Sequence, residues 1–208
     1  MERLIAQAED MAEQGVKELI LVAQETTVYG KDLYGKKSLH ILLKKLCEIR
    51  GIRWIRILYC YPEEIYDELI QVMKEEKKIC HYLDLPIQHA SDKILKRMGR
   101  RTTRVQLTEI VEKLRREIPD IVLRTTLITG FPGETEEDHQ ELMEFDRLGA
   151  FTYSPEEGTP AEKMADQVPE ELKEERRDQL MELQQEISLE KGNDRIGQEL
   201  MVMIEGKV

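Results

Sequence analysis

Compact apolar runs alternate with helix-like patterns along most of this 208-residue chain. The apolar runs predict buried strands at about residues 18–23, 54–59, 82–88, 121–129 and 148–153. Between them, apolar residues at three- and four-residue spacings predict helices at about 2–14, 38–46, 62–73, 91–98, 103–118, 135–145 and 170–191. Such alternation is typical of βα units, so we expect an α/β fold whose parallel sheet curves into all or part of a (β/α) barrel.

The stretch at residues 121–134, IVLRTTLITGFPGE, organises this pattern. Its apolar density predicts a strand buried on both faces, followed by a glycine-rich turn and the acidic start of a helix. Ligands of α/β proteins bind beyond the carboxyl ends of the strands, so the turn is a candidate binding element. The alternative is a tight turn whose glycines serve geometry only. Arg124 is expected to point into a barrel or cleft, or else to pair with an acidic neighbour such as Asp84.

Polar residues recur just past each predicted strand. They are Gln24 to Thr26, Tyr59 with Tyr61, Gln88 with His89, Thr129 with Gly130, and Tyr153 with Ser154. Because parallel strands place their carboxyl ends at one edge of a sheet, we expect these groups to converge on one ligand. Chance polarity of loops is the alternative explanation.

Composition narrows the function classes. The chain carries 31 basic and 42 acidic residues, a formal net charge of −11, which favours solubility and argues against broad binding to nucleic acid. No stretch reaches membrane-spanning length and no signal peptide is recognisable, so a cytosolic protein is expected. Cys47, Cys60 and Cys80 lack a clustered spacing and predict reduced, mostly buried thiols. The four histidines also lack metal-ligand spacing, so we expect no metal site in this chain.

Five segments together resemble the radical-SAM methylthiotransferases. They are VAQETTVYGKDLYG (22–35), WIRILYCYP (54–62), LDLPIQHASDKILKRMGR (83–100), RTTLITGFPGETEEDH (124–139) and FTYSPEEGTPA (151–161). The resemblance is closest to the bacterial branch that methylthiolates the β-carbon of an aspartate in ribosomal protein S-twelve. It implies a partial barrel of radical-SAM type that uses S-adenosylmethionine, two 4Fe–4S clusters, an electron donor and a small-subunit ribosomal protein as substrate.

The resemblance also implies roles for individual residues. Those expected to contact S-adenosylmethionine are Gln24, Glu25, Thr26, Tyr59, Gln88, Arg124, Thr126, Gly130, Phe131 and Tyr153. Arg124 could pair with the methionine carboxylate, and the glycine turn would let the backbone approach the adenine. His89, Glu156 and Glu157 are expected to face the substrate. No residue is assigned a catalytic role.

The acidic loop favours one of two branches of the family. The sister branch, which acts on an adenosine of transfer RNA, carries a serine at the position of His89 and an arginine in the loop that here contains Glu156 and Glu157. Acidic residues suit a basic protein better than a polyanion, so RNA binding is not expected to dominate. The alternatives are a transfer-RNA methylthiotransferase, a non-catalytic barrel fragment that binds the ribosome, and an acid–base enzyme built around His89 and Glu134.

The chain departs from the family at several points. The three-cysteine CxxxCxxC loop is expected before the first helix, and the domain of the second cluster before that; neither is present. A further segment is expected to be missing between Phe145 and Asp146. We expect a barrel at residues 1–168, a connecting helix at 169–192 and the first strand of a small β-barrel (TRAM) domain within 193–208. The isolated chain is therefore expected to bind no cluster and to be inactive.

Overall fold

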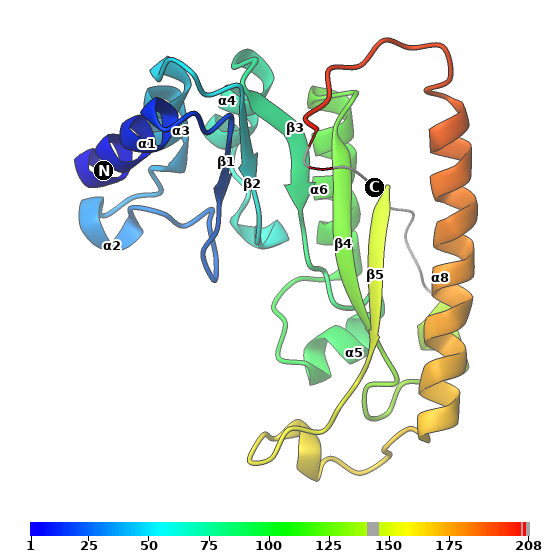
Figure 1. Ribbon diagram of the computed structural model, residues 1–208. Coiled ribbons are helices and arrows are strands. Elements are labelled where there is room, and N and C mark those ends of the chain that lie inside the picture. The colour runs from blue at the N-terminus through cyan, green and yellow to red at the C-terminus, as the bar shows by residue number, and fades with distance from the viewer. Residues whose placement is uncertain (141–145, 205, 207–208) are drawn as a thin grey trace.

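Five parallel strands form one sheet in which neighbours in space are also neighbours in the sequence. The computed structural model describes residues 1–140, 146–204 and 206. The order is β1-β2-β3-β4-β5, visible from left to right in Figure 1. The strands are β1 (Glu18–Leu21), β2 (Trp54–Ile57), β3 (Ile79–Asp84), β4 (Val122–Thr129) and β5 (Arg147–Thr152). The expected α/β fold with a parallel sheet is confirmed, and the open sheet is consistent with a partial barrel.

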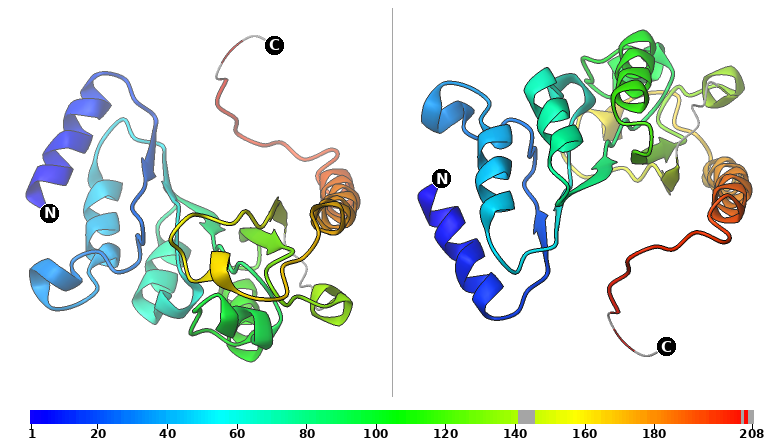
Figure 2. Two further views of the ribbon diagram at one scale, coloured as in Figure 1. Left: turned by 90° about the horizontal axis from the view of Figure 1, so that it is seen from below. Right: turned by 90° about the horizontal axis from the view of Figure 1, so that it is seen from above.

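Helices connect successive strands and lie mainly on one face of the sheet (Figure 2). The helices are α1 (Glu2–Glu13), α2 (Lys31–Tyr34), α3 (Leu39–Glu48), α4 (Asp67–Glu75), α5 (Asp92–Arg97), α6 (Arg104–Glu117), α7 (Glu136–Gln140) and α8 (Glu170–Asn193). Short 3-10 helices occur at Pro62–Glu64 and Ala161–Lys163. No helix in the described part of the chain is long and apolar enough to cross a membrane.

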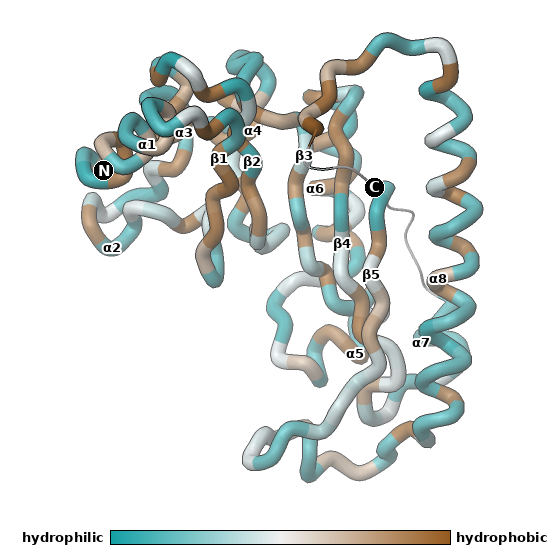
Figure 3. Tube along the Cα trace, in the orientation of Figure 1, coloured by the Kyte–Doolittle hydropathy of each residue, from teal (hydrophilic) through white to brown (hydrophobic). Residues whose placement is uncertain are grey.

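The core lies between the sheet and the helix layer. Along β4 the buried residues alternate with half-buried ones, so Leu123 and Leu127 face the helices while Arg124 and Thr126 face the other way. We call this second side the inner face. The expectation that this strand is buried on both faces was wrong, because the layer of α1, α3, α4 and α6 covers only one side. Figure 3 shows the strongly hydrophobic segments concentrated on the strands and on the helices packed behind them, whereas α8 is mainly hydrophilic.

Two elements differ from the expectations, and a third lies partly outside the described residues. The third strand was expected at 82–88, but β3 begins at Ile79 and ends at Asp84, and Gln88 retains only an isolated bridge to Leu127. The helix expected from Pro62 is divided into the 3-10 turn at Pro62–Glu64 and α4. The helix expected at 135–145 begins as α7, and its remaining residues lie outside the described ones. The expected deletion between Phe145 and Asp146 borders the same residues, so it stays a prediction.

The long helix α8 runs beside β5, antiparallel to it in Figure 1. The Gln184 amide donates to the Asp146 carbonyl at 3.2 Å, and Lys191 pairs with the Asp146 carboxylate at 2.6 Å. The strand expected at 199–204 does not form: its apolar side chains are 40–86% exposed and the segment has no regular structure. A strand needs a hydrogen-bonding neighbour, and no described segment pairs with this one. Its assignment to a TRAM domain, and the expected domain boundaries, stay predictions.

Candidate functional site

The carboxyl ends of neighbouring strands contact each other in sequence order. Beyond β1, the Thr26 amide donates to the Tyr59 carbonyl at 3.0 Å and the Thr26 hydroxyl donates to the Leu58 carbonyl at 2.6 Å. Beyond β3, the Gln88 amide donates to the Thr126 carbonyl at 3.0 Å. The Cys60 amide joins the two groups by donating to the Asp84 carbonyl at 2.9 Å. The polar strand ends therefore form one edge, as parallel strand geometry predicts.

A hollow of about 450 Å³ opens at the ends of β4 and β5. We call it the tip hollow. Four of the expected cofactor residues line it: Gln88, Thr126, Phe131 and Tyr153. The Phe131 and Tyr153 rings stand edge to face with centroids 5.1 Å apart, which provides an aromatic wall. A hollow of this size, mostly apolar with a few polar groups, is typical of a small-molecule site.

The Tyr153 hydroxyl is a polar group available to a ligand. Tyr153 is only 8% exposed, and its buried hydroxyl oxygen has no hydrogen-bond partner among the described residues. Leaving such a group without a partner is costly, because it loses its water without compensation. A nucleoside bound in the tip hollow would bring hydroxyl and ring-nitrogen partners within reach. The chemistry of these residues is compatible with the adenosyl part of S-adenosylmethionine, and their expected role as cofactor contacts stays a prediction.

Two of the expected cofactor residues have strained backbones. Tyr59 has φ of 56° and Gln88 has φ of 72°, in the left-handed region that side chains other than glycine rarely adopt. Both residues follow a strand, and both are held by hydrogen bonds from neighbouring strand ends. Strain of this kind concentrates at functional sites, where it fixes a group in place. This supports the assignment of these two positions to a binding site.

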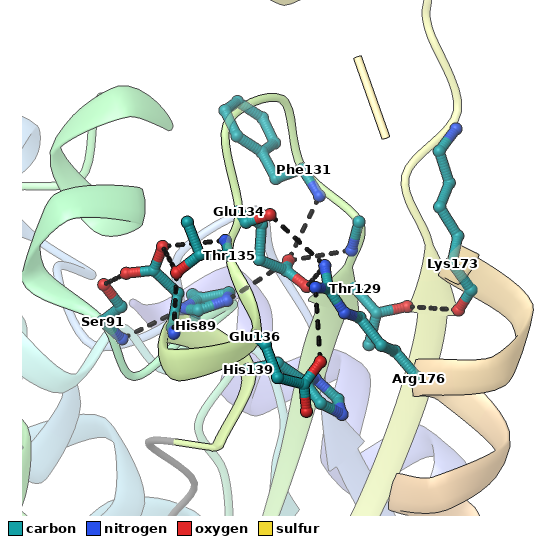
Figure 4. Close-up of polar contacts among 12 residues, drawn as sticks. His89, Ser91, Thr129, Phe131, Glu134, Thr135, Glu136, His139, Lys173 and Arg176 are labelled. Carbon is teal, nitrogen blue, oxygen red and sulfur yellow. Dashed lines mark hydrogen bonds and ion pairs between the residues drawn. The ribbon is translucent and has the colours of Figure 1, made fainter. Parts of the chain in front are cut away.

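A buried carboxylate closes the glycine-rich turn after β4 (Figure 4). The Glu134 side chain is fully buried, and its Oε2 accepts from the Gly130 amide at 2.8 Å and from the Phe131 amide at 3.2 Å. Its Oε1 accepts from the Arg176 guanidinium of α8 at 2.9 Å. Lys173, also on α8, donates to the Tyr153 carbonyl at 2.9 Å. Helix α8 thus supports both walls of the tip hollow from behind.

His89 belongs to the same buried network. It is 6% exposed, its Nδ1 accepts from the Ser91 amide at 2.9 Å, and its Nε2 lies 3.4 Å from Glu134 Oε2. The loop after β3 folds under the glycine turn and carries the His89 ring inward, and the expected role of His89 in facing the substrate stays a prediction. The pairing also removes support from an acid–base site, because both groups are engaged inside the protein.

Asp138 ties this loop to α7. Its carboxylate accepts from the Ser91 hydroxyl at 2.6 Å, from Lys93 at 2.6 Å and from the Thr135 amide at 2.9 Å. Burial alone would raise the pKa of Asp138, but these hydrogen bonds together outweigh burial and hold the pKa well below its ordinary value. The charged form is therefore part of the folded structure.

Other expected site residues lie outside the tip hollow. Glu25 and Thr26 line a separate apolar hollow of about 450 Å³ between α1, β1 and α3. Burial raises the pKa of Glu25, although its carboxylate accepts from the amides of Thr27 and Tyr61 at 2.9 and 2.7 Å. Gln24 and Tyr59 are exposed at the same edge.

The substrate-facing loop beyond β5 carries Glu156 and Glu157, and both are exposed. Their role in substrate binding stays a prediction.

Arg124 projects from the inner face of β4 and pairs with Asp84 of β3, with Nη1 2.6 Å from Oδ1. The Asp84 side chain is 4% exposed and that of Arg124 is 39% exposed, so the guanidinium remains accessible. The structural alternative considered for Arg124 is confirmed. An additional anionic partner is still sterically open to it.

The cysteines do not form a cluster site. Cys47 and Cys60 are buried, Cys80 is half-buried, and all three are free thiols. Burial raises the pKa of Cys47 to about 11 and also raises that of Cys60, which disfavours the thiolate form that binds iron. Among the described residues no group of three or more His, Cys, Asp or Glu could hold a metal ion. The residues present therefore do not fit an iron–sulfur cluster.

Several residues of the tip hollow were missed from the sequence. Met98, Arg100 and Phe151 also line it. Phe151 could have been found, because it stands two residues before Tyr153 and so shares its side of the strand. Met98 and Arg100 follow a short helix, and their approach depends on a loop path that no local pattern indicates.

Comparison with known proteins identifies a family and close relatives of this chain. The profile of the radical SAM superfamily matches residues 1–145. A protein of Lachnoclostridium phytofermentans named ribosomal protein uS12 methylthiotransferase RimO is 64% identical over 214 residues, covering 100% of this chain and 49% of its own length. One of the same name from Desulfitobacterium hafniense is 57% identical, covering 98% and 47%. The chain therefore spans about half the length of these relatives.

Solved structures support the fold. The cobalamin-dependent S-adenosylmethionine radical enzyme OxsB superposes with a TM-score of 0.54 at 16% identity, covering 77% of this chain and 24% of that one. The archaeal Elp3 of Methanocaldococcus infernus superposes with a TM-score of 0.52 at 16% identity, covering 77% and 44%. At such identities the similarity concerns the fold alone.

Proposed function

The chain belongs to the radical SAM superfamily, and on that premise we propose that it is the barrel part of a methylthiotransferase that modifies an aspartate of a small-subunit ribosomal protein. The observation that carries this proposal is the 64% identity over the whole chain to a relative named for that activity on uS12. The acidic residues of the loop beyond β5 also favour a basic protein substrate over RNA.

Within this function, the tip hollow takes the nucleoside part of S-adenosylmethionine. The aromatic wall of Phe131 and Tyr153 packs against the adenosyl group, and the Tyr153 hydroxyl supplies a hydrogen bond. Gln88 and Thr126 supply further polar contacts from the ends of β3 and β4. Glu134 and Arg176 act as positioning residues, because they hold the backbone of the turn rather than the ligand.

The family implies iron–sulfur chemistry that generates a radical from the bound cofactor. Since the described residues do not fit a cluster, we assign no step of that chemistry to this chain. The cluster ligands, the sulfur-supplying domain and the electron donor would be provided by protein segments or partners other than the residues described. The inactivity of the isolated chain remains a prediction.

The test compares two tyrosines whose hydroxyls are buried in different hollows. The hydroxyls of Tyr153 and Tyr29 are both buried without a partner among the described residues, but Tyr29 lines the apolar hollow behind β1. Tyr153→Phe should weaken binding of S-adenosylmethionine about three- to tenfold, the value of one hydrogen bond. Tyr29→Phe should leave binding unchanged.

Ligand-observed NMR at millimolar S-adenosylmethionine measures both variants, because weak binding is expected without a chelating iron. Equal effects of the two substitutions, or no binding to the unmodified chain, would contradict the proposed use of the tip hollow.

A further inference from the structure

A second hollow, of about 620 Å³, opens on the inner face next to α8. We call it the arginine hollow. Arg124 of β4 and Arg147 of β5 line it together with Tyr82 of β3, and α8 closes its side with Gln184, Gln185 and Ser188. The lining contains two arginines and no carboxylate, in a chain whose formal net charge is −11. This hollow is therefore locally positive in an acidic protein, which favours an anionic ligand.

The two arginines stand directly opposite each other. Arg124 and Arg147 are register partners on neighbouring parallel strands, so their side chains leave the sheet on the same side. Like charges in this arrangement repel unless an anion compensates them. Asp84 neutralises Arg124, whereas Arg147 donates to the Ser188 hydroxyl at 3.1 Å and has no carboxylate within 4.0 Å among the described residues. Among the described residues, the positive charge of Arg147 is therefore left without a counterion.

The face of α8 toward this hollow is depleted of acid. Glu170–Asn193 contains eight carboxylates, but positions 181, 184, 185 and 188, which line the hollow on successive turns, are Met, Gln, Gln and Ser. A glutamate at any of them could neutralise Arg147. The amides and hydroxyl found there can instead hydrogen-bond an anion without competing with it.

The arginine hollow lies next to the tip hollow along β4. Arg124, Thr126 and Ile128 alternate on the inner face, and Thr126 lines the tip hollow two residues beyond Arg124, a distance of about 7 Å. Gly149 is the register partner of Thr126 and has no side chain to divide the two spaces. The Arg124 guanidinium lies over this glycine, 3.7 Å from the position a Cβ would occupy.

We propose that the arginine hollow binds a carboxylate, and that this carboxylate is the aspartyl side chain of the protein substrate. The inference rests on the proposed function for the choice of ligand. Two guanidinium forks can hold a carboxylate through several charge-assisted hydrogen bonds. A carboxylate held there would lie one pair of residues along β4 from Thr126, which lines the tip hollow, so the substrate side chain would be held next to the cofactor site.

The test uses the 208-residue chain and two blocked amino acids that differ only in charge. N-acetyl-aspartate methylamide and N-acetyl-asparagine methylamide are titrated while backbone amides and arginine Nε–H signals are followed by NMR. The aspartate probe should shift Arg124, Arg147 and residues 148–150, and the asparagine probe should not. Arg147→Gln should weaken aspartate binding about tenfold. Arg147→Lys, which keeps the charge but loses the fork, should give an intermediate loss.

Arg53→Gln serves as the control, because Arg53 is exposed immediately before β2 and does not line this hollow. Equal binding of both probes, shifts mapped elsewhere, or equal effects of the Arg147 and Arg53 substitutions would overturn the proposal. A titration with S-adenosylmethionine distinguishes the source of the carboxylate: if it shifts the two arginines and the aspartate probe does not, the ligand is the cofactor and the substrate assignment is wrong. Failure of the proposed function is separable, since it would abolish cofactor shifts at the tip hollow and leave the aspartate response intact.

Discussion

At the scale of single residues, the site depends on a glycine with a positive φ. Gly130 has φ of 71°, and a Cβ added to it would lie 2.1 Å from Lys173 Cγ. Both features follow from the turn that brings the backbone amides of Gly130 and Phe131 to the Glu134 carboxylate. A side chain here would disturb the turn and the contact with α8 together.

Gly130→Ala should therefore lower the free energy of unfolding by about 2–5 kcal/mol, the sum of the left-handed strain and the overpacking. Gly158→Ala is the matched control, because Gly158 has φ of 81° with nothing within 4 Å of an added Cβ. It should cost only about 1–2 kcal/mol. Urea denaturation of the two variants measures the difference, and equal losses would show that Lys173 does not restrict this position.

Asp138 predicts a specific pH dependence of stability. Because its folded pKa lies below the unfolded value of about 4, its stabilisation is complete above that pH and is lost as the pH falls toward the folded value. Asp138→Asn should reduce the free energy of unfolding by about 1–3 kcal/mol at neutral pH, and the gap should close in acid. Glu157→Gln, at an exposed position, should show neither effect. Urea denaturation at several pH values checks this, and a gap that persists in acid would contradict it.

Residue-level chemistry was only partly predictable from the sequence. The pairing of Arg124 with Asp84 could be anticipated, because a strand arginine near an acid usually finds it. The inward turn of His89 could not, since it depends on the Glu134 carboxylate reaching back to the turn. The positive φ values of Tyr59 and Gln88 leave no trace in composition, because neither residue type signals that conformation.

At the scale of elements, α8 is more than a connector. Its first turns carry Lys173 and Arg176, which are 4% and 3% exposed and contact the two turns that bound the tip hollow. Its later turns line the arginine hollow. Charges on such a helix ordinarily form a solvated face, but these two side chains are buried because α7 and β5 pack against them.

Arg176→Met should be strongly destabilising, by about 3–5 kcal/mol, because it leaves the Glu134 carboxylate buried without its cation. The double variant with Glu134→Gln should recover part of this loss, since a neutral amide can still accept from the turn amides. Arg177→Met is the control on the same helix, where the pair with Asp178 is on the surface and contributes less than about 1 kcal/mol. Additive losses in the double variant would argue against direct coupling.

Helix-capping signals in the sequence were reliable where the capping residue hydrogen-bonds within its own helix. Thr103 was expected to begin a helix, and it does so with a capping box: its hydroxyl accepts from the Gln106 amide at 3.3 Å, and the Gln106 side chain accepts from the Thr103 amide at 2.9 Å. Ser91 precedes α5 as expected, but it makes no side-chain cap and donates to Asp138 instead. Tertiary competition of this kind is invisible to a local pattern.

At the scale of the whole molecule, the strand order followed from the alternation of strands and helices, because right-handed connections place each strand beside the last. The division of the strand edge into separate hollows did not follow from this alternation. Glu25 and Thr26 face a space behind β1, while Gln88, Thr126, Phe131 and Tyr153 share the tip hollow. The direction of each loop side chain decides which hollow it lines, and that direction is set only when the loops pack against the rest of the protein.

The most direct test of the account is a residue-resolved NMR map of the chain titrated with S-adenosylmethionine. The account predicts that the amides of Gln88, Thr126, Phe131 and Tyr153 shift together with one binding curve, while Leu4 and Met11 of the apolar hollow stay unchanged. Shifts centred on the apolar hollow, or none near the ends of β3 to β5, would contradict it.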